Sequence, residues 1–130
     1  MKIGIVGAGV MGSGVAQSFA TYGHEIFLLD INEEAFDSCR QNIKNSVRMI
    51  NFMKIQENKL DFKEVMEKIS FSTDYSVFSD CDIIVENVVE NIEVKKSVYE
   101  ELEKICKEDC IYLVNTSCIS ITKIGSYTNR

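Results

Sequence analysis

The stretch Lys2-Ile3-Gly4-Ile5-Val6-Gly7-Ala8-Gly9-Val10-Met11-Gly12 joins a short apolar run to three closely spaced glycines. The apolar run is rich in isoleucine and valine and predicts a buried strand. Apolar residues at helical spacing then continue to Tyr22 and predict a helix. A G-x-G-x-x-G pattern between a strand and a helix is typical of a turn that binds the diphosphate of a dinucleotide, so we predict such a site here.

Each part of this turn has its own physical role. Gly7 permits the tight turn, Gly9 lets the backbone approach a diphosphate, and Gly12 allows the helix to pack closely on the strand. The amides of Val10 and Met11 open the helix and face the phosphates, because the first N–H groups of a helix have no partner within it. The alternative is a tight turn that binds no ligand.

An acidic residue follows the second predicted strand, which covers residues 25–29. Asp30 lies 18 positions after Gly12, and its carboxylate can accept hydrogen bonds from both ribose hydroxyls of an adenosine. The same charge repels a 2′-phosphate, and neither Ile31 nor Asn32 offers a cation. The sequence therefore favours NAD over NADP. Domains that bind FAD or S-adenosylmethionine use a similar turn. An FAD-binding domain usually has a glutamate at the end of the second strand, and the spacing of the third glycine fits a dinucleotide better than a methyl donor.

Strand and helix patterns alternate along nearly the whole chain. This alternation predicts an α/β fold of the Rossmann type, with a doubly wound, mostly parallel sheet and a helical hairpin inserted after the second strand. No internal boundary is visible, so residues 1–130 form one domain. We predict strands at 2–6, 25–29, 69–72, 82–86 and 111–114, and helices at 10–22, 33–53, 62–68, 93–107 and from 121 onward.

The composition excludes several classes of function. Hydrophobic residues make up 45% of the chain and charged residues 26%, which is the balance of a soluble domain. The net charge of −6 argues against binding to nucleic acid or to anionic membranes, since both need clustered cations. No apolar run approaches the roughly 18 residues of a membrane span, and no secretory signal is visible, so we expect a cytoplasmic protein.

Cysteine and histidine usage narrows the chemistry further. The five cysteines are odd in number and lack a C-x-x-C pair, and no histidine completes a zinc site beside Cys106 and Cys110. We therefore predict reduced cysteines and no metal. His24 is the only histidine, and its Gly-His-Glu turn precedes the second strand. This position is at the opposite end of the sheet from the expected site, so we interpret His24 as a surface residue.

Three ordered segments resemble the 3-hydroxyacyl-CoA dehydrogenases. The segments are the opening from Gly7 to Gly14 followed by Ala16, the stretch C-D-I-I-V-E-N-V-V-E-N-I-E-V-K-K from Cys81 to Lys96, and N-T-S-C-I-S-I-T from Asn115 to Thr122. The bacterial 3-hydroxybutyryl-CoA dehydrogenases are nearest in style. The resemblance implies an enzyme with an acyl-CoA substrate, which oxidises the 3-hydroxyl of an (S)-3-hydroxyacyl-CoA to a 3-ketoacyl-CoA with NAD, or catalyses the reverse reduction with NADH.

The resemblance also implies roles for residues that follow two of the strands. Glu90 and Lys95 match residues beside the nicotinamide end of the cofactor, and Asn115 matches a residue that contacts cofactor and substrate. Ser117 matches a serine that hydrogen-bonds the reacting oxygen, where a hydroxyl can steady charge during hydride transfer. The structural alternatives are that Glu90 and Asn91 cap a helix, that Lys95 is solvated, and that 115–117 form an ordinary turn.

Two further residues match family contacts to the CoA moiety. Ser46 and Lys54 lie in the predicted helical hairpin, and the ammonium of Lys54 can neutralise a phosphate. The alternative is plain helix surface for both. Cys118 stands where the family has a second serine, a nearly isosteric replacement that we expect to be tolerated.

The family's general base is a histidine in an H-F-F-N-P-like segment, oriented by a downstream glutamate, and both come after the part that this chain matches. The same holds for the all-α domain that carries most of the family's dimer contact. The resemblance therefore implies a homodimer for the longer enzyme, whereas we expect the 130-residue chain alone to be a monomer and inactive. Two rival functions stay open: a free-standing regulatory module that binds NAD(H), and a β-hydroxyacid dehydrogenase acting on a free acid.

Overall fold

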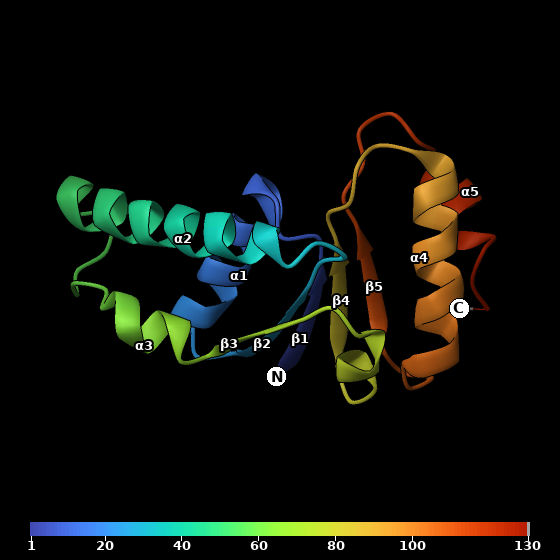
Figure 1. Cartoon of the computed structure of the whole chain (residues 1–130), viewed down its shortest axis with the longest axis horizontal. Coiled ribbons are helices and arrows are strands. Elements are labelled where there is room, and N and C mark those ends of the chain that lie inside the picture. The colour runs from blue at the N-terminus through green and yellow to red at the C-terminus, as the bar shows by residue number, and fades with distance from the viewer. Residues whose placement is uncertain (130) are drawn as a thin grey trace.

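Residues 1–129, which the computed structural model describes, contain one five-stranded parallel sheet (Figure 1). Its strand order is β3-β2-β1-β4-β5, and every neighbouring pair runs parallel. The order reverses between β1 and β4, which creates the crevice where α/β sheets of this kind bind ligands. The strands are β1 (Lys2–Val6), β2 (Glu25–Leu29), β3 (Ile69–Ser72), β4 (Ile83–Glu86) and β5 (Ile111–Val114).

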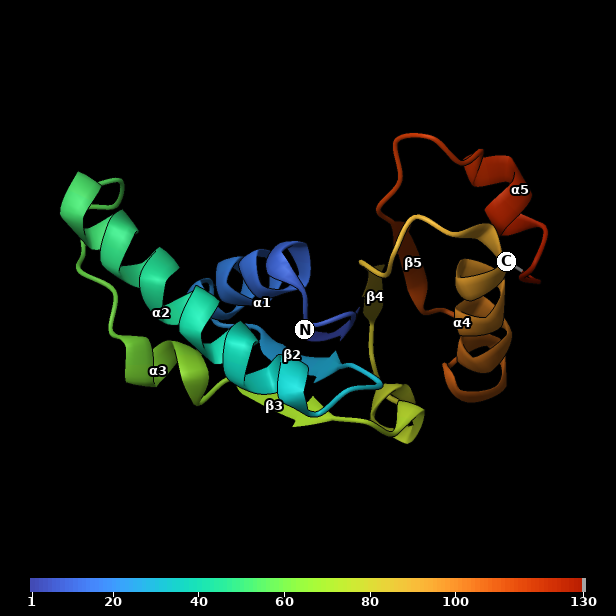
Figure 2. The same ribbon diagram turned by 45° about the horizontal axis from the view of Figure 1, so that its top comes forward.

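Helices cover both faces of the sheet, as the predicted doubly wound fold requires. Figures 1 and 2 show α1, α2 and α3 on one side and α4 and α5 on the other. Ile3 and Ile5 of β1 pack against the side with α1 and α2, whereas Val6 packs against the side with α4 and α5. The helices are α1 (Val10–Thr21), α2 (Glu34–Met53), α3 (Phe62–Met66), α4 (Ile92–Ile105) and α5 (Ile121–Gly125), and a 3₁₀ turn, η1, spans Tyr75–Phe78.

The helix α1 turns its small residues towards the sheet. Its buried residues include Gly12, Ala16 and Ala20, which allow the helix backbone to approach β1 and β2 closely. Gly23 takes a φ of +86° just after the helix, a left-handed conformation that glycine adopts readily and that commonly ends a helix. The close approach brings the amino end of α1 directly over the carboxyl end of β1.

The predicted helical hairpin after β2 is present. The Asn32 side chain accepts a hydrogen bond from the Glu34 N–H at 3.0 Å, and Asp61 caps α3 in the same manner. At the far end of the hairpin, the Asn51 amide bonds both backbone groups of Leu60. Figure 2 shows this hairpin extending away from the sheet. None of the helices within residues 1–129 has the length and apolar character needed to cross a bilayer.

The helices predicted at 62–68 and 93–107 end earlier, at Met66 and Ile105. Two further details differ from the sequence-based expectation. Val94, Val98 and Leu102 recur at helical spacing, so the sequence predicts that all three face the core, but Val94 is 38% exposed while the neighbouring Lys95 is buried. The face of α4 that is buried includes Lys95 instead of Val94, because the Lys95 ammonium pairs with the carboxylates of Glu86 and Glu90. The η1 turn was not predicted, since four residues are too few to show a helical period. Its start is stabilised by Asp74, which accepts a hydrogen bond from the Ser76 N–H at 2.9 Å.

Candidate functional site

The glycine turn between β1 and α1 has the backbone geometry that the sequence predicted. Gly7 has a φ of +101°, and a Cβ there would lie 2.7 Å from the carbonyl oxygen of Asn87. A Cβ on Gly12 would lie 1.8 Å from the Gly7 carbonyl oxygen. A Cβ on Gly9 would meet nothing within 4 Å. Gly7 and Gly12 are therefore needed by the fold, whereas Gly9 leaves open space in front of the turn.

The amino end of α1 is suited to an anion. Gly9 is the N-cap residue, so no side chain caps the helix, and its first turn contains no acidic residue. Val10 and Met11 are both exposed at this end. The unpaired N–H groups and the positive end of the helix dipole favour a negatively charged group here. A diphosphate fits this position because Gly9 lets it approach the backbone.

Asp30 lies directly beside the glycine turn, at the carboxyl end of β2. One carboxylate oxygen accepts the Ala8 N–H at 2.8 Å, and the other accepts the Asn32 N–H at 3.0 Å. A carboxylate oxygen can accept more than one hydrogen bond, so each keeps capacity for a hydroxyl. The two backbone bonds hold the carboxylate in place. The position and charge of Asp30 fit the ribose of an adenosine whose diphosphate binds at Gly9.

A cavity of about 280 Å³ opens between the glycine turn and the ends of β2 and β4. Apolar side chains form most of its wall, with Asp30 at one edge and Asn87 at another. Such a slot suits a flat purine ring next to a polar ribose site. Its lining residues are Val6, Gly7, Gly9, Leu29, Asp30, Ile31, Tyr75, Asn87, Val88, Val89, Val94 and Val98.

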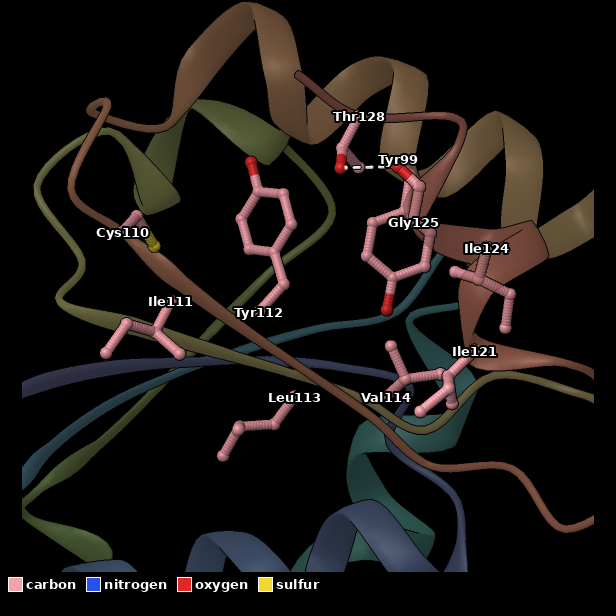
Figure 3. Close-up of a pocket in the computed structure, with 10 residues that line it drawn as sticks. All are labelled: Tyr99, Cys110, Ile111, Tyr112, Leu113, Val114, Ile121, Ile124, Gly125 and Thr128. Carbon is pink, nitrogen blue, oxygen red and sulfur yellow. Dashed lines mark hydrogen bonds between the residues drawn. The ribbon is translucent and has the colours of Figure 1, made fainter. Parts of the chain in front are cut away.

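A larger cavity of about 600 Å³ lies elsewhere, between β5, α4 and α5. Figure 3 shows its wall, in which the Tyr99 and Tyr112 rings stand beside the apolar residues of β5 and α5. Burial raises the pKa of Tyr99 above the ordinary tyrosine range, and the negative charge of Glu86 acts in the same direction. None of the predicted site residues lines this cavity. We therefore assign it no part in the cofactor site.

A fully buried ion pair lies under the ends of β4 and β5. Lys95 Nζ is 2.8 Å from both carboxylate oxygens of Glu86, and both side chains have no exposed surface. The same ammonium donates to the Asn115 carbonyl at 3.0 Å. The alternative that Lys95 is a solvated helix residue is therefore wrong. Lys95 joins the start of α4 to the ends of both strands.

Glu90 holds the loop that follows β5. Its carboxylate accepts a hydrogen bond from the Thr116 hydroxyl and one from the Cys118 N–H at 3.4 Å, and it lies 3.5 Å from the Lys95 ammonium. These contacts lower the pKa of Glu90, with the Thr116 hydroxyl as the largest cause, so the carboxylate stays ionised. Asn91, rather than Glu90, caps α4, since its side chain accepts from the Glu93 and Val94 N–H groups.

The asparagines at the ends of β4 and β5 meet. The Asn115 amide donates to the Asn87 side-chain oxygen at 2.9 Å. Ser117 is exposed in the same loop, with its hydroxyl 3.6 Å from the Cys118 sulfur. The fold thus brings the predicted residues of the glycine turn, Asp30, Glu90, Lys95, Asn115 and Ser117 to one edge of the sheet, because all of them follow the carboxyl ends of parallel strands or lie in the adjoining first turn of α4.

The two predicted CoA contacts lie away from this edge, in the helical hairpin. The Ser46 hydroxyl donates to the Gln17 side-chain oxygen at 2.9 Å, so it joins α2 to α1. Lys54 ends α2 with a φ of +51° and has an exposed side chain at the tip of the hairpin. His24 lies at the amino end of the sheet, where its ring packs edge-on against Phe19 and its Nδ1 is 3.5 Å from the amino terminus.

Sequence reasoning missed Glu86, Asn87 and Thr116 as members of this edge. Each lies within a segment that resembles the 3-hydroxyacyl-CoA dehydrogenases, but the resemblance implied no role for any of the three. The signal that could have indicated Glu86 is its charge at the last position of an otherwise apolar strand. A carboxylate at that place needs a cation, and Lys95 is in the first turn of the next helix.

Comparison with known proteins gives consistent matches. Residues 2–130 match the family described as 3-hydroxyacyl-CoA dehydrogenase, NAD binding domain. A 3-hydroxybutyryl-CoA dehydrogenase of Clostridioides difficile is 38% identical over 131 aligned positions, covering 100% of this chain and 46% of its own length. The mitochondrial hydroxyacyl-coenzyme A dehydrogenase of Homo sapiens is 37% identical, with 97% of this chain and 42% of its own length covered.

Solved structures agree with these relatives. The crystal structure of (S)-3-hydroxybutyryl-CoA dehydrogenase PaaH1 from Ralstonia eutropha superposes with a TM-score of 0.89 at 32% identity, covering 99% of this chain and 45% of that one. FadB2 of M. tuberculosis gives a TM-score of 0.88 at 32% identity, covering 98% of this chain and 45% of that one. This chain spans less than half the length of these relatives.

Proposed function

The chain belongs to the 3-hydroxyacyl-CoA dehydrogenase family as an NAD-binding domain, and from this premise we propose how its residues hold NAD(H) and which reaction they serve. The domain binds NAD(H) along the carboxyl edge of the sheet, for hydride transfer between the cofactor and the 3-position of an acyl-CoA. The single observation that carries the proposal is the open space before Gly9, with the uncapped start of α1 behind it and Asp30 beside it.

The adenosine half of the cofactor belongs on the β2 side of the crevice. The Val10 and Met11 amides bind the diphosphate at the start of α1, and Asp30 accepts the ribose hydroxyls. The apolar cavity beside Asp30 receives the adenine ring. A 2′-phosphate at the same ribose would meet the Asp30 carboxylate, and this repulsion favours NAD over NADP.

The other half of the cofactor would lie over the ends of β4 and β5, where bound NAD would accept a hydride or bound NADH would donate one. Asn115 contacts the cofactor and the substrate. Glu90 holds the loop after β5, which contains both Asn115 and Ser117. The Ser117 hydroxyl donates to the reacting oxygen of the substrate, where negative charge develops as the hydride moves. Glu90 and Lys95 lie beside the nicotinamide end, with Lys95 acting through its neighbours because its ammonium is enclosed.

The names of the relatives and the position of Lys54 in the hairpin support acyl-CoA as the proposed substrate class. Relatives with this domain are named for 3-hydroxybutyryl-CoA and hydroxyacyl-coenzyme A. Lys54 is placed to neutralise a phosphate of the CoA moiety from the exposed tip of the hairpin. Ser46 serves this contact less directly, since its hydroxyl already donates to Gln17 and keeps only acceptor capacity.

The longer enzyme supplies what this domain does not. We propose a homodimer in which the general-base histidine, its glutamate partner and an all-α domain come from sequence beyond the matched region. More than half the length of the relatives lies outside the match, which leaves room for such a domain. The cytoplasm is the proposed location, because five cysteines in odd number without a C-x-x-C pair suit a reducing compartment.

Adding a methyl group at Gly9 tests the proposed cofactor site. Gly9 has a φ of −68°, which alanine adopts readily, and its Cβ would meet no protein atom within 4 Å. We therefore expect Gly9→Ala to fold normally but to bind NADH at least about ten-fold more weakly, because the methyl group occupies the diphosphate position. Titration of NADH fluorescence measures the affinity, and circular dichroism checks the fold.

The matched control is Gly14→Ala, which adds the same methyl group one turn later in α1, also into open space. This variant should bind NADH as the wild type does. NADPH, titrated in parallel, should bind the wild type at least about ten-fold more weakly than NADH. Unchanged NADH affinity in Gly9→Ala would contradict a diphosphate site at this turn.

Turnover by the isolated 130-residue chain is expected to be absent. Proton transfer to the reacting oxygen needs a general acid or base within hydrogen-bond reach, and the one histidine of the chain lies at the opposite edge of the sheet. Mixing the chain with NADH and acetoacetyl-CoA should leave the absorbance of NADH unchanged. Robust oxidation of NADH would mean that a residue of this domain moves the proton.

A further inference from the structure

Glu86 is a charged residue in a place where the fold does not require one. It ends β4, is fully buried, and pairs with the fully buried Lys95. Buried ion pairs stabilise a protein little when compared with apolar residues of the same size, because both charges lose their hydration. The stability of the domain therefore gives no reason for this pair, and its position at the carboxyl edge of the sheet suggests a role there.

The Lys95 ammonium is the point at which four segments meet. It donates to both oxygens of Glu86 at the end of β4, and to the Asn115 carbonyl at the end of β5. It also lies 3.5 Å from a Glu90 oxygen, in the loop before α4. Glu86 in turn accepts the Val88 N–H at 2.8 Å, which fixes the beginning of that loop. One cation thus ties the loop after β4 to the loop after β5.

These two loops are the part of the crevice that receives the second half of the cofactor. A dinucleotide lies across the point where the strand order reverses. With its adenosine beside Asp30 at the end of β2, its nicotinamide half extends over the ends of β4 and β5. The Asn115 side chain is fixed by Asn87, and Thr116 is fixed by Glu90, so both loops carry contacts that depend on their relative position.

We propose that Glu86 is a positioning residue for the nicotinamide half of NAD(H). It holds the Lys95 ammonium at the point where that cation joins the loops after β4 and β5, without itself touching the cofactor. The adenosine half is held by separate groups, at the glycine turn and Asp30. Loss of the pair therefore affects one half of the ligand and spares the other. The inference rests on the proposed cofactor site.

The test removes both charges together. Glu86→Gln alone would leave the buried ammonium with Glu90, 3.5 Å away, as its remaining charged partner, and removing one partner of a buried ion pair is strongly destabilising. The double variant Glu86→Gln/Lys95→Met nearly keeps the side-chain volumes and leaves no unpaired charge in the interior, because the Glu90 side chain that also faces Lys95 is 38% exposed. Calorimetric titration with NADH and with ADP, which lacks the nicotinamide and its ribose, separates the two halves of the site. Circular dichroism and thermal melting confirm that the variant is folded.

We expect the double variant to bind ADP within about two-fold of the wild type and NADH at least about ten-fold more weakly. If this variant folds poorly, a second neutral pair, Glu86→Gln/Lys95→Gln, replaces it, and we expect the same changes in its affinities for NADH and ADP. The matched control is Glu101→Gln/Lys104→Met, which removes an exposed ion pair of 2.6 Å from the same helix. This control should bind both ligands as the wild type does.

Three outcomes would overturn the inference. Unchanged NADH affinity in a folded double variant would show that the pair has no role in binding. Equal losses for NADH and ADP would show a general structural role rather than positioning of one half of the ligand. A wild-type chain that binds ADP but gains nothing from the nicotinamide half of NADH would overturn the proposed cofactor site first, and the inference with it.

Discussion

Gly12→Ala is expected to destabilise the domain more than any other glycine-to-alanine change. The new Cβ would lie 1.8 Å from the Gly7 carbonyl oxygen, which belongs to the backbone of the glycine turn and cannot rotate away. Relief of the clash would push α1 off β1 and open the closest contact of helix and sheet. Overpacking typically costs 1–3 kcal/mol, and a backbone clash lies at the upper end, so we expect a loss of about 3 kcal/mol.

Thermal melting followed by circular dichroism measures this loss, and a decrease of roughly 10 °C in the melting temperature is expected. Gly14→Ala is again the control, because it lies in the interior of the same helix with open space at its Cβ position. It should stabilise the chain by about 0.5–1 kcal/mol, the usual gain of alanine over glycine within a helix. A Gly12→Ala protein that melts like the wild type would mean that α1 does not pack this closely.

The three glycines of the turn should therefore separate into two classes. Gly7 and Gly12 serve the fold, since a Cβ on either would clash with backbone atoms. Gly9 serves the ligand, since its Cβ would point into open space. Alanine at Gly12 should lower stability and binding together, whereas alanine at Gly9 should lower binding alone. The motif by itself does not show this division, because the sequence pattern treats all three positions alike.

The fold could be predicted from the sequence because its signals are local. A run of β-branched residues before the glycine turn predicted β1, and Asp30 marked the end of β2. The helix predicted from residue 62 begins there, because the Asp61 side chain before it accepts the Lys63 N–H as an N-cap residue does. Each of these signals depends on a few adjacent residues and on backbone conformations that only some residue types adopt. The parallel order of the sheet then followed from the alternation of strands and helices.

The contacts within the site could not be predicted in the same way, because they join distant segments. Helical patterning treats a lysine as a solvent-facing residue, so the expected apolar stripe of α4 ran through Val94. Only the folded chain places Glu86 beneath the first turn of α4, where it makes burial of Lys95 favourable. The free-energy cost of burying a charge cannot be judged from sequence when the partner that offsets it lies in another element.

The hairpin shows the same limit for the CoA contacts. Ser46 and Lys54 were predicted from a resemblance, and no local physical signal distinguished them from ordinary helix surface. The structure shows that they differ in kind. Ser46 is engaged between α2 and α1 through Gln17, while Lys54 is exposed at the hairpin tip. Of the two, only Lys54 has a side-chain group without a hydrogen bond to residues 1–129, which is why the proposed phosphate contact falls to it.

Asp30→Asn is expected to weaken NADH binding strongly while leaving the glycine turn intact. The asparagine oxygen can still accept the Ala8 N–H, which the native carboxylate accepts at 2.8 Å. The variant loses the charge that strengthens the hydrogen bonds from the two ribose hydroxyls. Hydrogen bonds to a charged group contribute about 1.5–3 kcal/mol each, so the change from charged to neutral acceptor should cost about 2 kcal/mol in all. This corresponds to a roughly 30-fold weaker affinity for NADH.

The response to NADPH makes this prediction specific to Asp30. Removal of the carboxylate charge also removes its repulsion of the 2′-phosphate, so NADPH should bind Asp30→Asn no more weakly than it binds the wild type. The preference for NADH over NADPH should therefore shrink by roughly the 30-fold lost for NADH. Asp37→Asn, an exposed aspartate in the first turn of α2 that pairs only with Arg40 among residues 1–129, should leave both affinities unchanged. If Asp30→Asn kept the full preference for NADH, discrimination between the two cofactors would depend on another residue, because the charge at the end of β2 is the group that meets the 2′-phosphate in the proposed site.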